Sequence, residues 1–170
     1  MLASCNSSNE YRIHGRVTPN DLEGVQIFLV PVGHEEAWNV DSIHIRNHSF
    51  EFRGKKHWMC ELRLESRHRY KGQNLLVATE PGDIYVTIGP DSSGGGTPQN
   101  DSLQVWKELT IQSGRLDNQL RGEGRLDEAI AARAAYRERT RAMAHALGDG
   151  SIAGEFLLNL YPEPKDGEKQ

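Results

Sequence analysis

The spacing of the apolar residues changes once along this chain, and the change falls within residues 80–106. Before this stretch apolar residues mostly alternate with polar ones, as in a strand that buries one face, whereas after it they recur every three or four residues, as in a helix. The stretch itself contains a Pro81-Gly82 turn, a last alternating run, Gly94-Gly95-Gly96 and a polar helix start. The sequence therefore predicts strands followed by helices, which argues against an alternating strand-helix α/β fold.

Seven short segments before residue 90 have the pattern of strands. Polar turns separate them, and Thr18-Pro19-Asn20-Asp21 is one of these. Such short, closely spaced strands indicate an antiparallel sandwich or barrel, and we predict a mainly β chain with an antiparallel β-sandwich of about seven or more strands. The segments are 11–17, 24–32, 43–45, 50–52, 58–64, 74–79 and 84–88.

One pair of segments predicts its own register. If Asn47-His48 forms a two-residue hairpin turn, Ile45 lies opposite Phe50 and Ile43 lies opposite Phe52, so that all four apolar side chains share a face. A type I′ turn requires positive φ at both central residues, which His48 adopts less readily than glycine. A slightly longer turn is therefore the alternative.

The second half of the chain predicts three helices and a polar end. Asn100 or Asp101 is the expected N-cap of the first helix, and a longer helix runs over residues 126–147 until Gly148 stops it. A short helix follows over residues 152–160. The predicted organisation is a start and tether at 1–9, the sandwich at 10–99, a C-terminal helical segment at 100–161 and a polar tail at 162–170.

The first residues resemble a lipidation signal. Leu2-Ala3-Ser4-Cys5 is similar to the lipobox of bacterial lipoproteins, and a Ser/Asn-rich tether follows it over residues 6–9. On this interpretation Cys5 carries a lipid and Met1 replaces a removed signal; the alternative is that Cys5 is an ordinary terminal residue. The other cysteine, Cys60, lies among apolar residues of one strand face, and we expect a buried structural thiol there.

Composition and motifs bear on several functional classes. The formal net charge is -4 with both signs interspersed, which argues against nucleic-acid binding, and no apolar run reaches the roughly 18 residues that span a bilayer. Gly94-Gly95-Gly96 lacks the lysine of a phosphate-binding loop, and Pro98 removes a backbone donor. The seven histidines are dispersed. The sequence therefore predicts no catalytic residues, no cofactor and no metal.

Several short motifs together resemble a known family. They occur in the order that the resemblance requires, over about residues 10–112, and Gly154-x-Phe156-Leu157-Leu158 looks like the helical continuation. The family is a β-sandwich domain of unknown function found in envelope lipoproteins of Gram-negative bacteria. The motifs are Tyr11-x-Ile13-x-Gly15, Asp41-Ser42 before an Asn47 turn, Phe50-x-Phe52-x-Gly54, Glu80-Pro81-Gly82 and Gly96-Thr97-x-x-Asn100.

The resemblance implies a place in the cell but no chemistry. Relatives commonly carry a thioredoxin-like thiol-disulfide oxidoreductase domain after the sandwich, whereas this sequence has no Cys-x-x-Cys, so the redox activity is not transferred. The family offers no catalytic residues for the sandwich. His48 departs from the family pattern, because relatives usually have glycine in that turn.

These observations predict a non-catalytic module of a Gram-negative cell envelope, held to the membrane only through a lipid at Cys5. It would act through an unknown protein or glycan partner and would not bind nucleic acid. One alternative is a carbohydrate-binding domain in which Trp38 or Tyr70 provides a stacking surface for a ligand. A second alternative is an unrecognised hydrolase.

Overall fold

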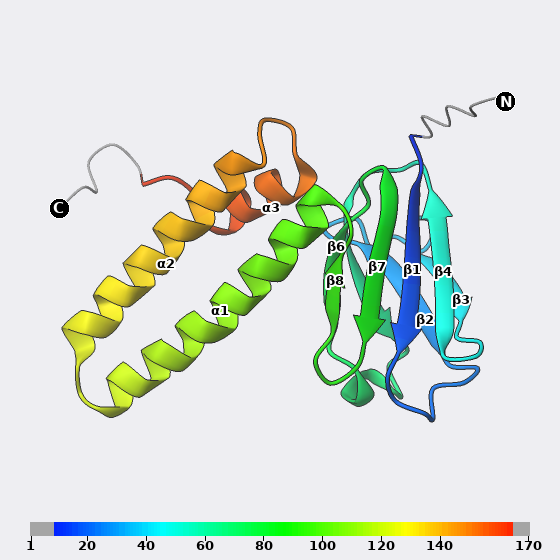
Figure 1. Ribbon diagram of the computed structural model, residues 1–170, viewed down its shortest axis with the longest axis horizontal. Helices are drawn as coiled ribbons and strands as arrows, with labels where there is room; N and C mark the ends of the chain where they lie inside the picture. The colour runs from blue at the N-terminus through cyan, green and yellow to red at the C-terminus, as the bar shows by residue number, and fades with distance from the viewer. Residues whose placement is uncertain (1–8, 165–170) are drawn as a thin grey trace, which may run out of the picture. The chain divides into compact units, whose positions relative to one another are not determined.

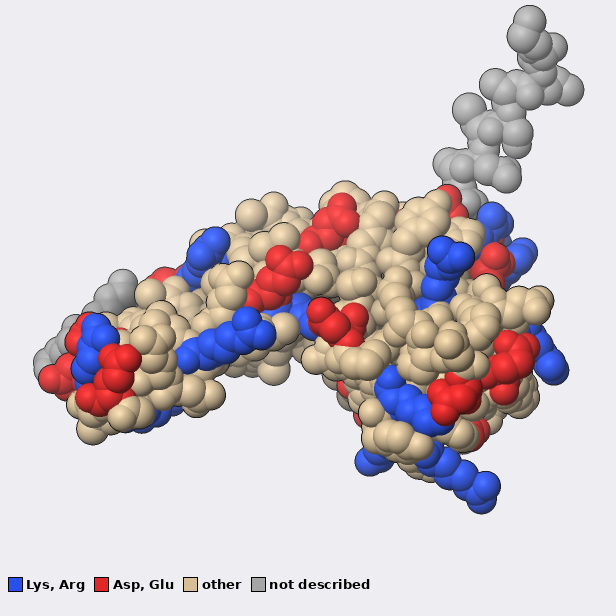
Figure 2. All heavy atoms as spheres, turned by 60° about the horizontal axis from the view of Figure 1, so that its bottom comes forward, with Lys and Arg blue, Asp and Glu red and all other residues tan. Residues whose placement is uncertain are grey.

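A computed structural model describes residues 9–164 and divides the chain into two compact units. The first unit ends at Asp101 and contains the strands; the second begins at Ser102 and contains most of the helical residues. Both charge signs are interspersed on the molecular face that Figure 2 shows.

The first unit contains two sheets of four strands each. One sheet has the order β4-β1-β7-β8 and the other β3-β2-β5-β6 (Figure 1). A single hydrophobic cluster includes buried side chains from both sheets, among them Ile13, Ile27 and Leu62, so the two sheets share one core. The strands are β1 (Tyr11–Val17), β2 (Gln26–Pro31), β3 (Asp41–His44), β4 (Ser49–Gly54), β5 (Met59–Leu64), β6 (Leu75–Ala78), β7 (Gly82–Ile88) and β8 (Ser93–Gly95).

The prediction of a wholly antiparallel arrangement is wrong for one ladder. β1 pairs with β7 in parallel, with Ile13 opposite Ile84, whereas the other ladders are antiparallel. A parallel pair needs a long crossover connection, and the five strands between β1 and β7 provide it. Strand β8 lay outside the seven predicted segments because its Ser93-Gly94-Gly95 sequence carries no apolar signal.

The predicted hairpin is correct at its turn and wrong beyond it. Asn47 and His48 have φ of 52° and 56°, as a type I′ turn requires, and Arg46 and Ser49 exchange two backbone hydrogen bonds of 2.9 and 3.0 Å. Beyond the turn, however, Ile43 pairs with Ile27 in one sheet, whereas Phe52 pairs with Ile13 in the other.

The chain crosses between the sheets at Ile45. Its backbone N–H donates to the carbonyl of Val25 at 2.9 Å, and its side chain is fully buried, whereas Ile43 is 37% exposed. The alternating pattern was therefore right about the apolar face of Ile45, Phe50 and Phe52, but Ile43 does not share it.

The structure explains why two positions of the family-like motifs are occupied by glycine. β1 and β4 place Gly15 opposite Phe50 and Tyr11 opposite Gly54. A Cβ atom added at Gly15 would lie 2.0 Å from the Phe50 ring, and one added at Gly54 would lie 2.8 Å from the Tyr11 hydroxyl oxygen. Each strand thus places an aromatic ring over the glycine of its neighbour, an arrangement that protects strand glycines.

The three helices are α1 (Pro98–Gly122), α2 (Leu126–Ala146) and α3 (Ile152–Leu160). They contain 25, 21 and 9 residues, so helical residues outnumber strand residues and the fold is mixed α/β instead of mainly β. α2 ends within one residue of the predicted end, and α3 has the predicted bounds, with the Ser151 hydroxyl accepting from the Gly154 N–H at 3.1 Å.

The first helix begins earlier than the N-cap residues Asn100 and Asp101 predicted. Proline is favoured in the first turn of a helix, and Pro98 starts α1. Asn100 serves instead as a partner for the sheet: its amide accepts from the Ala78 N–H at 3.0 Å and donates to the Ala78 carbonyl at 2.8 Å. The side chain therefore does for Ala78 what a neighbouring strand would do.

In the second unit, aromatic side chains hold the helices together. The Tyr136 hydroxyl lies 3.1 Å from the Trp106 ring nitrogen and 3.1 Å from the Tyr161 hydroxyl, while Phe156 packs edge-on against Trp106. Desolvation raises the pKa of Tyr161 to about 12. Across residues 9–164, none of the helices has the length and apolar character that crossing a membrane requires.

Candidate functional site

An aromatic and basic hollow opens in the first unit. It measures about 370 Å³ and includes residues from the loop between β2 and β3 and from the loop between β4 and β5. Its basic members are Arg53, Lys55 and Lys56, and Asp41 is its acidic member. We call it the Trp38 hollow; the rest of its lining is Tyr11, Leu29, Pro31, Trp38, Asn39, Val40, Gly54, Trp58, Cys60 and Thr79.

Trp38 is the largest exposed group of the hollow. Its side chain is 76% exposed, although tryptophan is usually highly buried. The Lys56 ammonium lies 5.6 Å from the centre of the Trp38 ring and 5.1 Å from that of the Trp58 ring, within cation–π range of both. His34 packs against Trp58 at 5.8 Å between ring centres. A cation is thus shared by two indoles, one of which is largely open to solvent.

Hydrogen bonds fix the loop that carries Trp38. The Asn39 side-chain amide donates to a Glu36 carboxylate oxygen at 2.9 Å, and the Asn39 backbone N–H donates to the Glu36 carbonyl at 2.8 Å. A backbone hydrogen bond holds the pKa of the Glu36 carboxyl below its ordinary value, and the Asn39 side-chain bond adds a smaller lowering. Within the same loop, Glu35 pairs with the Arg63 guanidinium at 3.3 Å. Trp38 is therefore presented by a hydrogen-bonded loop.

Thr79 fixes the opposite wall of the hollow. Its buried hydroxyl accepts from the Trp58 N–H at 2.7 Å and lies 2.8 Å from the Lys56 carbonyl, to which it donates. The Thr79 backbone N–H donates to the Trp58 carbonyl at 2.9 Å. Lys56 and Trp58 are therefore held by one residue that follows β6.

Tyr11 and Cys60 are buried residues of the lining, and neither is ionised at neutral pH. Burial raises the pKa of the Cys60 thiol to about 12, and burial also raises that of the Tyr11 hydroxyl to about 12. At neutral pH both groups are protonated, so Cys60 lacks the thiolate that a redox nucleophile needs. The expectation that Cys60 is buried is confirmed.

The other predicted ligand-stacking residue, Tyr70, is not part of this hollow. It lies in the short helix η1 (Arg69–Lys71), is 78% exposed, and has the Lys71 ammonium 5.6 Å from its ring centre. Trp38 and Tyr70 are thus equally exposed aromatics, each beside a lysine, on different loops. The predicted lipidation residue, Cys5, lies outside the described residues.

A third exposed aromatic, Tyr85, has a histidine stacked on its ring. It is 59% exposed on β7, and His14 stacks on its ring at 5.1 Å. His14 in turn lies 2.7 Å from Asp83 and 3.7 Å from Glu51, so its ring nitrogens face carboxylates. Within the described part of the chain, no three His, Cys, Asp or Glu side chains form a metal-binding group.

The glycine-rich stretch has a structural role. Gly96 has φ of +100°, and its backbone N–H donates to the Asp101 carboxylate at 2.8 Å, so a protein carboxylate already takes that donor. Glu80 accepts from the Gln99 N–H at 2.7 Å. These bonds join the first turn of α1 to the sheet region and leave no phosphate-binding arrangement at Gly96.

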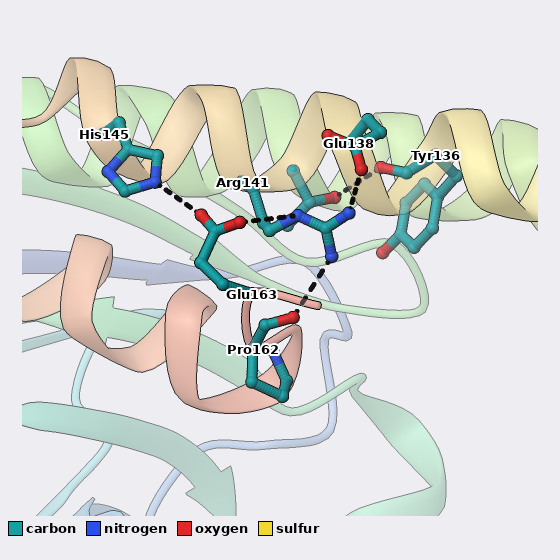
Figure 3. Close-up of polar contacts among 7 residues, drawn as sticks. Tyr136, Glu138, Arg141, His145, Pro162 and Glu163 are labelled. Atoms are coloured by element: carbon teal, nitrogen blue, oxygen red, sulfur yellow. Dashed lines mark hydrogen bonds and ion pairs between the residues drawn. The ribbon is translucent and has the colours of Figure 1, made fainter. Parts of the chain in front are cut away.

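The second unit contains a buried arginine that holds the end of the described chain (Figure 3). Arg141 is 7% exposed, pairs with Glu138, and donates to the Pro162 carbonyl at 3.3 Å. Glu163 lies 3.8 Å from Arg141 and 2.9 Å from His145. Because carboxylates surround this arginine, it acts as a clamp for residues 162–163 more readily than as a site for an incoming anion.

Two four-stranded sheets that share one core, with three helices and an open aromatic hollow, define a mixed α/β protein with a candidate binding site. Residues 11–103 match the family described as Domain of unknown function (DUF4369), and because this is more than half of the chain, the protein belongs to that family. The prediction of a domain-of-unknown-function family is thereby confirmed. Neither the curated proteins nor the solved structures contain a significant match.

The sequence indicated Trp38 as a candidate but missed its companions. Lys56 and Trp58 were not singled out together with Trp38, because they lie about 20 residues away in the sequence and on a different loop. A Lys-x-Trp pair beside a predicted strand start was the available signal, but the strand partners had to be known before it could be joined to Trp38.

Proposed function

We propose that this protein is a non-catalytic cell-envelope module, lipid-anchored at Cys5, which acts through protein or glycan contacts made at the Trp38 hollow. The observation that carries the proposal is the exposed Trp38 ring on a loop fixed by Asn39. Large aromatics dominate the energy of recognition surfaces, and a fixed loop loses little conformational freedom when a partner binds.

The proposal includes the architecture and the cellular setting that the resemblance implies. We interpret the two sheets as a β-sandwich, because one buried cluster joins them. We relate the chain to the N-terminal domains of thioredoxin-like envelope lipoproteins of Gram-negative bacteria. The lipobox-like Leu2-Ala3-Ser4-Cys5 and the tether at residues 6–9 support anchoring.

Anchoring has a direct test. We expect the native protein to partition into the detergent phase and its Cys5 peptide to carry the mass of a lipid. A Cys5→Ala variant should lose both properties. An unmodified Cys5 in native protein that stays wholly in the aqueous phase would remove the anchoring part of the proposal.

The role of the hollow is tested in cells. Native protein, a Trp38→Ala variant and a Tyr70→Ala variant are crosslinked in place, and their neighbours are identified by mass spectrometry. Tyr70 is the matched control because it is equally exposed and also lies beside a lysine. We expect Trp38→Ala to lose crosslinked protein or glycan and Tyr70→Ala to keep it. Identical crosslinks from all three proteins would refute the assignment of the Trp38 hollow.

A carbohydrate-binding domain is the second candidate, and the exposure of Trp38 favours it. A sugar ring has one face of C–H groups, which packs on an indole, and hydroxyls that need polar partners. The Trp38 hollow offers both, since the side chains of Asn39 and Asp41 lie in the same lining.

A further inference from the structure

The charges of the Trp38 hollow favour an anionic ligand. Three of the four charged side chains in its lining are basic. Arg53 is paired with Glu51, and one oxygen of the acidic member, Asp41, accepts the Ser42 N–H at 3.2 Å. Lys55 is exposed and makes no ion pair or hydrogen bond within the described residues. Among the described residues, the hollow therefore has one lysine without an ion pair, Lys55, and a second, Lys56, that is held between two rings.

The dimensions of the hollow favour a small ligand over a protein surface. Its volume of about 370 Å³ lies near the lower end of the range for small-molecule sites, which is roughly 300 to 1,000 Å³. A stable protein interface generally buries more than about 1,000 Å² and has several large anchors. This hollow has a single highly exposed ring, Trp38, since Trp58 is half-buried.

We propose that the Trp38 hollow binds a saccharide that carries a carboxylate or phosphate group. The C–H face of one sugar ring packs on Trp38, and the anionic group lies against the ammonium groups of Lys55 and Lys56. This inference rests on the proposed function, and it names the ligand class for the same site. Asn39 also lines the hollow, and its side-chain oxygen is buried without a hydrogen-bond partner among the described residues.

The test is a binding titration of the full chain with matched sugars. Tetragalacturonate is compared with its fully methyl-esterified form, which keeps the sugar rings and removes the charge; mannose 6-phosphate is compared with mannose. The first pair tests carboxylates and the second tests phosphates. Calorimetry reports binding. Because the chain has three tryptophans, the fluorescence change of the native protein is compared with that of Trp38→Ala to assign the signal to Trp38.

We expect at least one acidic probe to bind about tenfold or more tightly than its neutral counterpart, with affinity that falls as salt rises. Trp38→Ala should weaken that binding by about tenfold or more, which is the effect of losing an aromatic anchor, and Lys55→Gln should weaken it less and reduce its salt dependence. Tyr70→Ala should bind as the native protein does. Since Trp38 and Lys55 are exposed, both variants should keep the native melting temperature.

Several results would overturn this inference, and they are distinguishable from failure of the proposed function. Equal binding of acidic and neutral sugars, both lost in Trp38→Ala, would overturn the anionic ligand and keep the hollow as a glycan site. If neither acidic probe binds while Trp38→Ala loses protein crosslinks, the ligand is a protein and the saccharide is refuted. If the protein binds an acidic peptide in preference to the acidic sugars, and Trp38→Ala loses that binding, the same conclusion follows.

Discussion

Replacing Gly15 with alanine should destabilise the two-sheet unit, because the added methyl group would overlap a buried ring. A Cβ at this position would lie 2.0, 2.2 and 2.4 Å from three atoms of Phe50, whereas carbon atoms in contact are separated by about 3.5 to 4.0 Å. A shift of a few tenths of an ångström cannot remove this overlap. Phe50, which is 6% exposed, must therefore leave its position or push the two strands apart.

The size of the effect follows from what Phe50 loses. Exposing a buried phenylalanine costs about 1.5 to 3 kcal/mol. Alanine recovers about 0.5 to 1 kcal/mol of the entropy that glycine loses in a strand, so we expect a net loss of about 0.5 to 2.5 kcal/mol. For a unit of this size, that loss lowers the melting temperature by roughly 2 to 20 °C.

The assay is chemical denaturation followed by far-UV circular dichroism, with two controls. Gly114→Ala, in the middle of α1, has no atom within 4 Å of the added Cβ and should stabilise by about 0.5 to 1 kcal/mol. The double variant Gly15→Ala with Phe50→Leu should lose less stability than the sum of the losses of the two single variants, because the smaller side chain at position 50 relieves the overlap. If Gly15→Ala is as stable as the native protein, or if the double variant is strictly additive, the packing argument is wrong.

Three further predictions concern buried polar groups. Asn100→Ala should destabilise by about 1 to 3 kcal/mol, because the Ala78 N–H and carbonyl lose their partners on Asn100. Asn100→Asp should cost more, because a carboxylate would face the Ala78 carbonyl. The exposed Asn118→Asp is the control, and denaturation midpoints equal to that of the native protein in both Asn100 variants would contradict this role. Burial raises the pKa of the Cys60 thiol to about 12, against about 8.5 in an unfolded chain. Between these values the thiol is protonated in the native state and ionised in the unfolded state, so the free energy of unfolding should fall as pH rises from about 8.5 towards 12. Cys60→Ala should make this fall shallower between pH 8.5 and 10, below the range in which Tyr11 contributes, and an unchanged pH profile would contradict the assignment. Arg141→Met should speed hydrogen exchange at the Tyr161 amide, since residues 162–163 lose their contacts with the guanidinium; unchanged protection would show that the arginine does not clamp this segment.

The sequence predicted local features well, because they depend on neighbouring residues. The alternation in residues 11–17 marks β1, the Asn47-His48 pair forms the type I′ turn, and residues 152–160 form α3. Each depends on side-chain period or on backbone preferences within a few residues.

Pairing between distant residues could not be predicted in the same way. Ile43 alternates correctly with Ile45, yet it pairs with Ile27, because the chain changes sheets at Ile45 and periodicity carries no information about a strand's partner. The same limit explains why Gly15 appeared only as a motif residue until β1 was aligned with Phe50. Trp38 was named from the sequence as an aromatic that could stack on a ligand, whereas Lys56 joined it only in three dimensions.

The parallel ladder between β1 and β7 has a consequence for biosynthesis. Of the described strands, β1 leaves the ribosome first, and one of its two edges stays open until residues as late as Ile88 have been made, because Val17 pairs with Ile88. Contacts between such distant residues form slowly, and an open strand edge invites pairing with other chains. Until β7 has been made, this edge of β1 is therefore the part of the nascent sheet that is open to pairing with other chains.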